Sequence, residues 1–204
     1  MQRAVVFGAA IAGVLWGASG VVAVLDPVPD PGPPGSSSFY LIEGSHALSE
    51  TAMAVALVGL WRTQVRRVGR LASVFFGLAV SATVLLALLT YIVVIGTTLG
   101  LGLEMPGAGE APPAVLVVLA TVFFVVTFVG LVAGYVGAGL ATVRSGVWPS
   151  LTGWPLVAHP FLLFANLVVY PIGIVIGILW VALASVARRA TFGAEAAPDV
   201  RASP

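Results

Sequence analysis

Long apolar runs alternate with short polar stretches along the chain, and each run has the length of a membrane-spanning helix. Such a helix needs about 20 apolar residues. The runs predict helices over residues 4–25, 39–61, 71–99 and 114–143. The stretches between them are rich in proline, glycine and charged residues, which end helices or prefer water. The pattern therefore predicts an all-α integral membrane helical bundle.

The stretch at residues 150–189 allows two interpretations. It is one long kinked helix, giving five helices, or two helices of about 19 residues separated at "YPIG", residues 170–173. Basic residues favour cytoplasmic loops. With six helices and a cytoplasmic N-terminus, eight arginines lie in the cytoplasm: Arg3, Arg62, Arg66, Arg67, Arg70, Arg144, Arg188 and Arg189. Four acidic residues then lie outside: Asp26, Asp30, Glu104 and Glu110. Five would put Arg188 and Arg189 on the other side, so we expect six transmembrane helices.

The N-terminal run is too long for a signal peptide. Its apolar stretch covers about 22 residues, against roughly 7–15 in the core of a signal peptide. We therefore expect an uncleaved first helix and a multi-pass protein of the plasma membrane with both termini cytoplasmic. Residues 1–190 are predicted to form one transmembrane domain, and the small, polar stretch 191–204 to be a disordered cytoplasmic tail.

Composition supports the membrane interpretation and removes several function classes. Of 204 residues, 59% are hydrophobic and 8% are charged, against about 25% charged in soluble domains. The net charge of +1, with no basic stripe, argues against a nucleic-acid partner. Cysteine is absent, which excludes disulfides and thiol catalysis. No P-loop, G-x-S-x-G or H-E-x-x-H motif occurs, so the sequence leans away from an enzyme and indicates no cofactor.

Glycine supplies the packing surfaces that helices need in lipid. Lipid tails are as apolar as leucine, so small residues that let backbones approach drive helix association. The chain has 24 glycines. Spacings of four residues join Gly13 with Gly17, Gly130 with Gly134, and Gly173 with Gly177. These faces predict close packing within the chain or, alternatively, a homo-oligomer in the bilayer.

The stretch "YLIEGSHALSETAM" places Glu43, His46 and Glu50 on one face of the second predicted helix. If that helix begins at Phe39, Glu43 lies in its first turn, where an acid is favoured by the helix dipole and helps to cap the N-terminus. His46 is either a polar residue satisfied by a neighbouring helix or part of a site. Glu50 lies about 16 Å along the helix, near the middle of a hydrocarbon core about 30 Å thick.

A carboxyl group such as that of Glu50 is unfavourable at that depth unless its surroundings compensate for it. An unpaired carboxylate there costs several kcal/mol, so the group must be protonated, paired or turned toward a polar cavity. The strongest candidate partner is His159, which Pro160 follows, and Asn166 lies on the same face as His159. A Glu50–His159 pair would suit a proton relay. Further hydroxyl groups are available from Thr51, Thr90, Tyr91 and Tyr135.

These residues leave three functions open. The first is a polytopic membrane protein that moves or senses a proton or small solute through a polar cluster around Glu50. The second is a structural or partner-binding subunit in which Glu50 and His159 only lock helices together. The third is a redox protein, with a metal on Glu43, His46 and His159 or a haem between the two histidines, although the spacing matches no recognised metal signature.

The stretch "GYVGAGLATVRSGVWPSLTGWPL" resembles a loose class of small, uncharacterised polytopic membrane proteins of GC-rich bacteria. The turn between helices that carries the likeness consists of Gly139, Ala141, Arg144, Gly146, Val147 and Pro149. The segments "AGVLWGASGVVAVL" and "YLIEGSHAL" are also similar. The resemblance implies about six helices and implies no activity.

Overall fold

The computed structural model describes residues 1–25, 34–100, 114–166, 169 and 172–192, and this part of the chain contains helices and no β-strand. The first three helices are α1 (Gln2–Leu25), α2 (Ser37–Gln64) and α3 (Gly69–Thr98). One continuous rod follows, made of α4 (Ala114–Val129), the π-helical turn η1 (Gly130–Gly134) and α5 (Tyr135–Ser145). The short 3-10 turn η2 (Ser150–Thr152), α6 (Trp154–Asn166) and α7 (Ile172–Phe192) complete the described helices.

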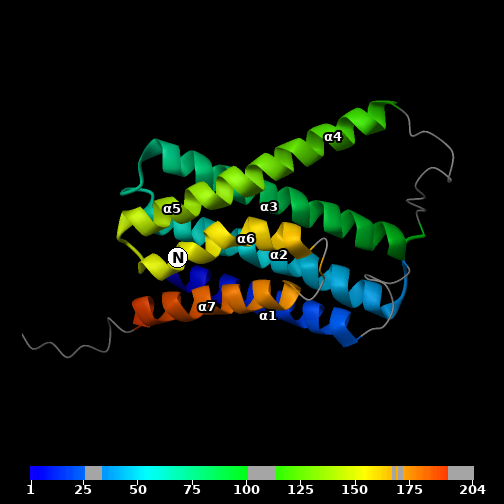
Figure 1. Cartoon of the computed structure of the whole chain (residues 1–204), viewed down its shortest axis with the longest axis horizontal. Coiled ribbons are helices and arrows are strands. Elements are labelled where there is room, and N and C mark those ends of the chain that lie inside the picture. The colour runs from blue at the N-terminus through cyan, green and yellow to red at the C-terminus, as the bar shows by residue number, and fades with distance from the viewer. Residues whose placement is uncertain (26–33, 101–113, 167–168, 170–171, 193–204) are drawn as a thin grey trace, which may run out of the picture.

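The six helical rods form a closed ring. Each rod packs against the rods before and after it in the chain, and α7 packs along α1. Successive rods run in opposite directions, so the N-terminus lies at the same end of the bundle as the last turn of α7 (Figure 1). At the opposite end α4 diverges from the other helices (Figure 1). The interior holds large, fully buried side chains, among them Phe76, Tyr135, Leu156, Ile176 and Trp180.

Four helices of the described part are long and apolar enough to cross a membrane: Gln2–Leu25, Gly69–Thr98, Thr121–Ser145 and Ile172–Phe192. Their outer faces expose valine, leucine, isoleucine and phenylalanine. The helix α2 is long enough but more polar, and it is shielded because α1 and α3 pack on its two sides. With 13 residues α6 is only about 20 Å long. The all-helical bundle is therefore as predicted, with four helices of membrane-spanning character.

The helix ends differ from the prediction in detail. The second helix begins earlier, because Ser36 caps it by accepting a hydrogen bond from the backbone N–H of Phe39 at 3.2 Å. The predicted break is confirmed, since α6 ends at Asn166 and α7 begins at Ile172. The last helix continues to Phe192, two residues into the stretch predicted as a tail. The rest of that tail and loops 26–33 and 101–113 lie outside the described residues.

Glycines with four-residue spacing bring helices of this chain together. A Cβ atom on Gly177 of α7 would lie 2.6 Å from the backbone nitrogen of Gly17 and 2.7 Å from the carbonyl oxygen of Gly13. On the long rod, a Cβ atom on Gly134 would collide with the backbone of Ala79 in α3. These glycine faces therefore pack helices of the same chain against one another. A homo-oligomer through them stays a prediction.

Candidate functional site

Glu50 lies at the middle of α2 with its side chain turned into the bundle, where it is 4% exposed. The hydroxyl oxygen of Thr90 in α3 lies 3.3 Å from the carboxyl oxygen Oε2 of Glu50. The same hydroxyl lies 3.0 Å from the carbonyl oxygen of Leu86. A threonine hydroxyl carries one proton. If Thr90 gives that proton to the closer carbonyl, the contact with Glu50 is a hydrogen bond only when the carboxyl carries a proton and donates it.

Tyr135 forms the second buried polar contact. The π-helical turn η1 ends immediately before it, and its side chain is completely buried. Its phenol oxygen lies 2.8 Å from the hydroxyl of Thr83, which also donates to the carbonyl oxygen of Ala79 at 2.8 Å. Thr83 has no second proton to give, so Tyr135 is the donor to Thr83. Glu50 interacts electrostatically with Tyr135, which places the two groups in the same region of the interior.

His159 is buried between Tyr135 and Trp180. The indole Nε1 of Trp180 donates to Nδ1 of His159 at 3.2 Å, and the two rings meet edge to face. The imidazole also lies against the Tyr135 ring, with the ring centroids 4.7 Å apart. Because Nδ1 accepts a hydrogen bond, a neutral His159 carries its proton on Nε2. The hydrogen bonds recorded for Glu50 and His159 therefore lead to Thr90 and Trp180, and not to one another.

These side chains form what we call the interior polar row: Glu50, Thr90, Thr83, Tyr135 and His159. The row consists of two hydrogen-bonded pairs, Glu50 with Thr90 and Thr83 with Tyr135, connected by one face of α3, and His159 joins the second pair through its ring contact with Tyr135. Thr83 and Thr90 are seven residues apart on that helix, which corresponds to about 10 Å along its axis and nearly the same angular position. The row brings groups with exchangeable protons from four helices, α2, α3, α5 and α6, into the interior of the bundle.

His46 lies apart from the row, at the contact of α2 with α1. Its Nε2 is 3.1 Å from the hydroxyl of Ser19, which also donates to the carbonyl oxygen of Trp16 at 2.9 Å. The imidazole lies against the Trp16 ring in a tilted arrangement, with the centroids 4.3 Å apart and the planes at 30°. One turn further along α2, Ser49 donates to the carbonyl oxygen of Ala12. His46 thus takes part in joining α1 to α2.

Asn166 is buried at the end of α6. The helix points it toward α7, where its Oδ1 would lie 3.4 Å from a Cβ atom on Gly173. Among the described residues this oxygen has no hydrogen-bond partner, and the same holds for the indole Nε1 of Trp16. Asn166 therefore belongs to the junction of α6 with α7 and makes no recorded contact with Glu50.

Glu43 is not in the first turn of its helix, so this prediction was wrong. The N-cap is Ser36, and α2 contains no acidic residue in its first turn. Glu43 is the seventh residue of the helix and is partly buried. Seven positions later on the same face lies Glu50, with which it interacts electrostatically. Glu43 is therefore part of the electrostatic surroundings of Glu50.

The metal and haem alternatives find no support in this arrangement. In the described part of the chain, no group of three or more histidine, cysteine, aspartate or glutamate side chains could hold a metal ion. The ring of His46 lies against that of Trp16 in α1, and the ring of His159 is enclosed by Tyr135 and Trp180. Each histidine is held by its own neighbours.

The sequence indicates Glu50, Thr90, Tyr135 and His159 as possible members of one cluster but does not indicate Thr83 and Trp180. Thr83 could have been found, because it precedes Thr90 by seven residues and so shares its helix face. Trp180 carries no such signal, since the contact depends on how α7 packs against α6. Comparisons with protein-family models, curated proteins and solved structures yield no match to this chain.

Proposed function

We propose that the chain is a six-pass membrane protein whose N-terminus and C-terminus both face the cytoplasm. The apolar outer faces of the helices support this placement. So does the position of the exposed arginines, which occur where α1 and α3 begin and where α2, α5 and α7 end, all at the same end of the bundle (Figure 1). Basic residues concentrate on the cytoplasmic side of membrane proteins. Short α6 is covered by α5 and α7, which reduces the length that must face lipid.

The placement predicts opposite sidedness for the two ends of the bundle. The chain contains no cysteine, so single Ser→Cys variants give a background-free label. Ser37, at the start of α2, and Ser150, in η2, are both exposed. In intact cells a membrane-impermeant thiol reagent is expected to label Ser37→Cys and to leave Ser150→Cys unlabelled until the cells are opened. Labelling of both from outside would overturn the topology.

We further propose that Glu50 binds the proton that this protein senses or moves. The observation that carries the proposal is the contact with Thr90, whose single proton faces two acceptors, Leu86 at 3.0 Å and Glu50 at 3.3 Å, and can fully satisfy only one of them. A protonated Glu50 donates to Thr90. When the proton leaves, Thr90 must turn its hydroxyl from the carbonyl oxygen of Leu86 to the carboxylate. Deprotonation of Glu50 in α2 therefore breaks a hydrogen bond within α3. Intramembrane ionisable groups are functional hypotheses by default.

Groups around Glu50 fit this role. Glu43 acts on it electrostatically, Glu50 in turn acts on Tyr135, and the interior polar row continues from it toward His159. Glu50 is almost completely buried in the bundle. This enclosure favours sensing over an open conduction path. It also favours the second candidate function, a structural subunit in which the Glu50–Thr90 contact only locks α2 to α3.

Glu50→Gln separates the two candidates. Glutamine keeps the shape and can donate to Thr90, so the bundle should unfold at nearly the same temperature as the wild type. The infrared band of a protonated carboxyl, present in wild type and titrating with pH, is expected to vanish in Glu50→Gln and to persist in Glu43→Gln. Any proton flux into liposomes should fall to the protein-free level. An unchanged infrared spectrum and unchanged flux in Glu50→Gln would leave only the structural role.

A further inference from the structure

A lateral groove of about 760 Å³ lies between the start of α3 and the η1–α5 part of the long rod. It is hollow because small residues form much of its floor, among them Ala72, Gly137 and Ala141. Gly137 is essential to this shape, since a Cβ atom there would collide with the ring of Phe75. Leu140 and the other aliphatic lining residues leave the walls apolar.

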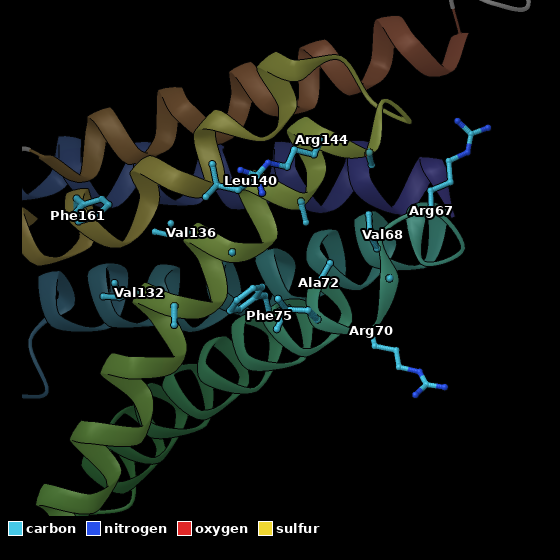
Figure 2. A pocket seen from close by; sticks show the side chains of 16 residues that line it. Arg67, Val68, Arg70, Ala72, Phe75, Val132, Val136, Leu140, Arg144 and Phe161 are labelled. Atoms are coloured by element: carbon cyan, nitrogen blue, oxygen red, sulfur yellow. The ribbon is translucent and has the colours of Figure 1, made fainter.

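Three arginines line this apolar groove. In Figure 2 Arg67 and Arg70 lie at one end and their side chains extend away from it in different directions, Arg144 lies nearer the middle beside Leu140, and Val132 and Phe161 lie toward the other end. All three arginine side chains are exposed. Both carboxylates of the described part belong to α2, and the nearer one, Glu50, lies about 20 Å before the end of that helix. The positive charge at the groove is therefore not neutralised by a described carboxylate.

The dimensions of the groove match one leaflet of a bilayer. Arg144 and Val132, which both line it, are twelve residues apart on the long rod, or about 18 Å. Half of a hydrocarbon core is about 15 Å thick. A ligand that fits has an anionic group at the arginine end and an apolar chain about as long as one leaflet. A free phosphate ion would fill only the arginine end.

The second lateral pocket shows what the arginines add. It measures about 470 Å³, and its lining residues, among them Trp154, Leu179 and Val186, are all apolar. Nothing in it distinguishes one lipid from another. The groove at α3 and α5 joins a comparable apolar surface to three guanidinium groups, which recognise phosphate by charge-assisted hydrogen bonds.

We propose that this groove binds an anionic phospholipid of the cytoplasmic leaflet, with the headgroup among the arginines that line it and one acyl chain along Phe75 and Phe161. Basic pockets between helices on the cytoplasmic side hold anionic headgroups in the same way. The proposal rests on the membrane placement proposed above and is independent of Glu50. The bound lipid would hold the start of α3 against α5. Glu50 contacts the same helix in its second half, at Thr90.

Native mass spectrometry of the full chain tests the charge requirement. Wild-type protein given equal amounts of phosphatidylglycerol and phosphatidylcholine is expected to retain the anionic lipid preferentially. The Arg70→Gln/Arg144→Gln double variant should bind phosphatidylglycerol about thirtyfold more weakly. Arg66→Gln is the matched control, because Arg66 is also exposed and lies beside Arg67 in the sequence but is not among the residues that line the groove. Equal loss in the control, or no loss in the double variant, would overturn the proposal.

A fluorescent reporter tests the acyl-chain position without removing any arginine. Val132→Trp places an indole toward the apolar end of the groove, where a brominated acyl chain quenches the fluorescence it adds to the wild-type signal; Val132, unlike Phe161, does not line the second pocket. Brominated phosphatidylglycerol is expected to quench more strongly than brominated phosphatidylcholine, and inorganic phosphate should not reverse the effect. Reversal by phosphate would identify a simple anion site instead. Glu50→Gln should leave lipid quenching unchanged, so failure of the Glu50 proposal can be told apart from failure of this one.

Discussion

Trp180→Ala is expected to destabilise the bundle by about 3 kcal/mol, more than any other single substitution proposed for this protein. Trp180 is fully buried where α7 meets α6, and its indole N–H donates to His159. Truncating a buried tryptophan costs about 3–5 kcal/mol in water-soluble proteins, through lost contacts and the cavity left behind. We expect the lower end because lipid, unlike water, does not penalise exposed apolar surface. Thermal unfolding in detergent measures the effect.

Two variants identify the cause of that loss. Trp154→Ala removes an identical side chain that is 54% exposed, so it should change the unfolding temperature little. Trp180→Phe keeps most of the ring but removes the donor to His159, and it is expected to cost about 0.6–1.7 kcal/mol, as interhelical hydrogen bonds in membranes do. If Trp154→Ala and Trp180→Ala prove equally harmful, the packing of α7 into the bundle is not as described.

Gly177→Ala is expected to destabilise the bundle by about 1–3 kcal/mol, because one methyl group would overpack the contact of α7 with α1. The new Cβ atom would lie 2.6 Å from the nitrogen of Gly17 and 2.7 Å from the oxygen of Gly13, and backbone atoms cannot turn away as a flexible side chain can. The helices must therefore separate. The unfolding temperature should fall even though alanine is otherwise the better helix former by about 1 kcal/mol.

Gly17→Ala is the matched control for this prediction. Gly17 lies on the facing helix in the same contact region, yet a Cβ atom on it would meet nothing within 4 Å. Alanine there should leave stability unchanged or raise it through its better helix propensity. Similar losses in Gly17→Ala and Gly177→Ala would show that glycine acts through backbone conformation and not through the close approach of the two helices.

Much of the fold is predictable because the signal for an apolar helix is local. The first, third and fourth predicted helices lie within a few residues of their observed ends, and the break before Ile172 follows from Pro171 and the arginine distribution. The predicted start of α2 is wrong because the cap depends on one serine among three: Ser36 bonds to Phe39, while Ser37 is already helical. That two-residue shift moves Glu43 out of the first turn.

The candidate site is only half predictable. The depth of Glu50 follows from counting residues along a helix, and its inward direction from the cost of a charge in lipid. Its partner does not follow. The sequence favours His159, but the packing of α3 beside α2 brings Thr90 to Glu50, and the packing of α7 brings Trp180 to His159. Helix periodicity specifies a face, and it does not specify which neighbouring helix covers that face.

Short stretches of sequence are enough to predict that this protein is a bundle of apolar helices, with the described arginines at the helix ends and one carboxyl midway along α2, since hydrophobicity, charge and helix periodicity are local properties. Other features come from tertiary packing: α7 closes on α1, the buried polar side chains divide into separate clusters, and Arg67, Arg70 and Arg144 share a groove. These features arise where residues far apart in sequence meet, at contacts set by how side chains of neighbouring helices interlock.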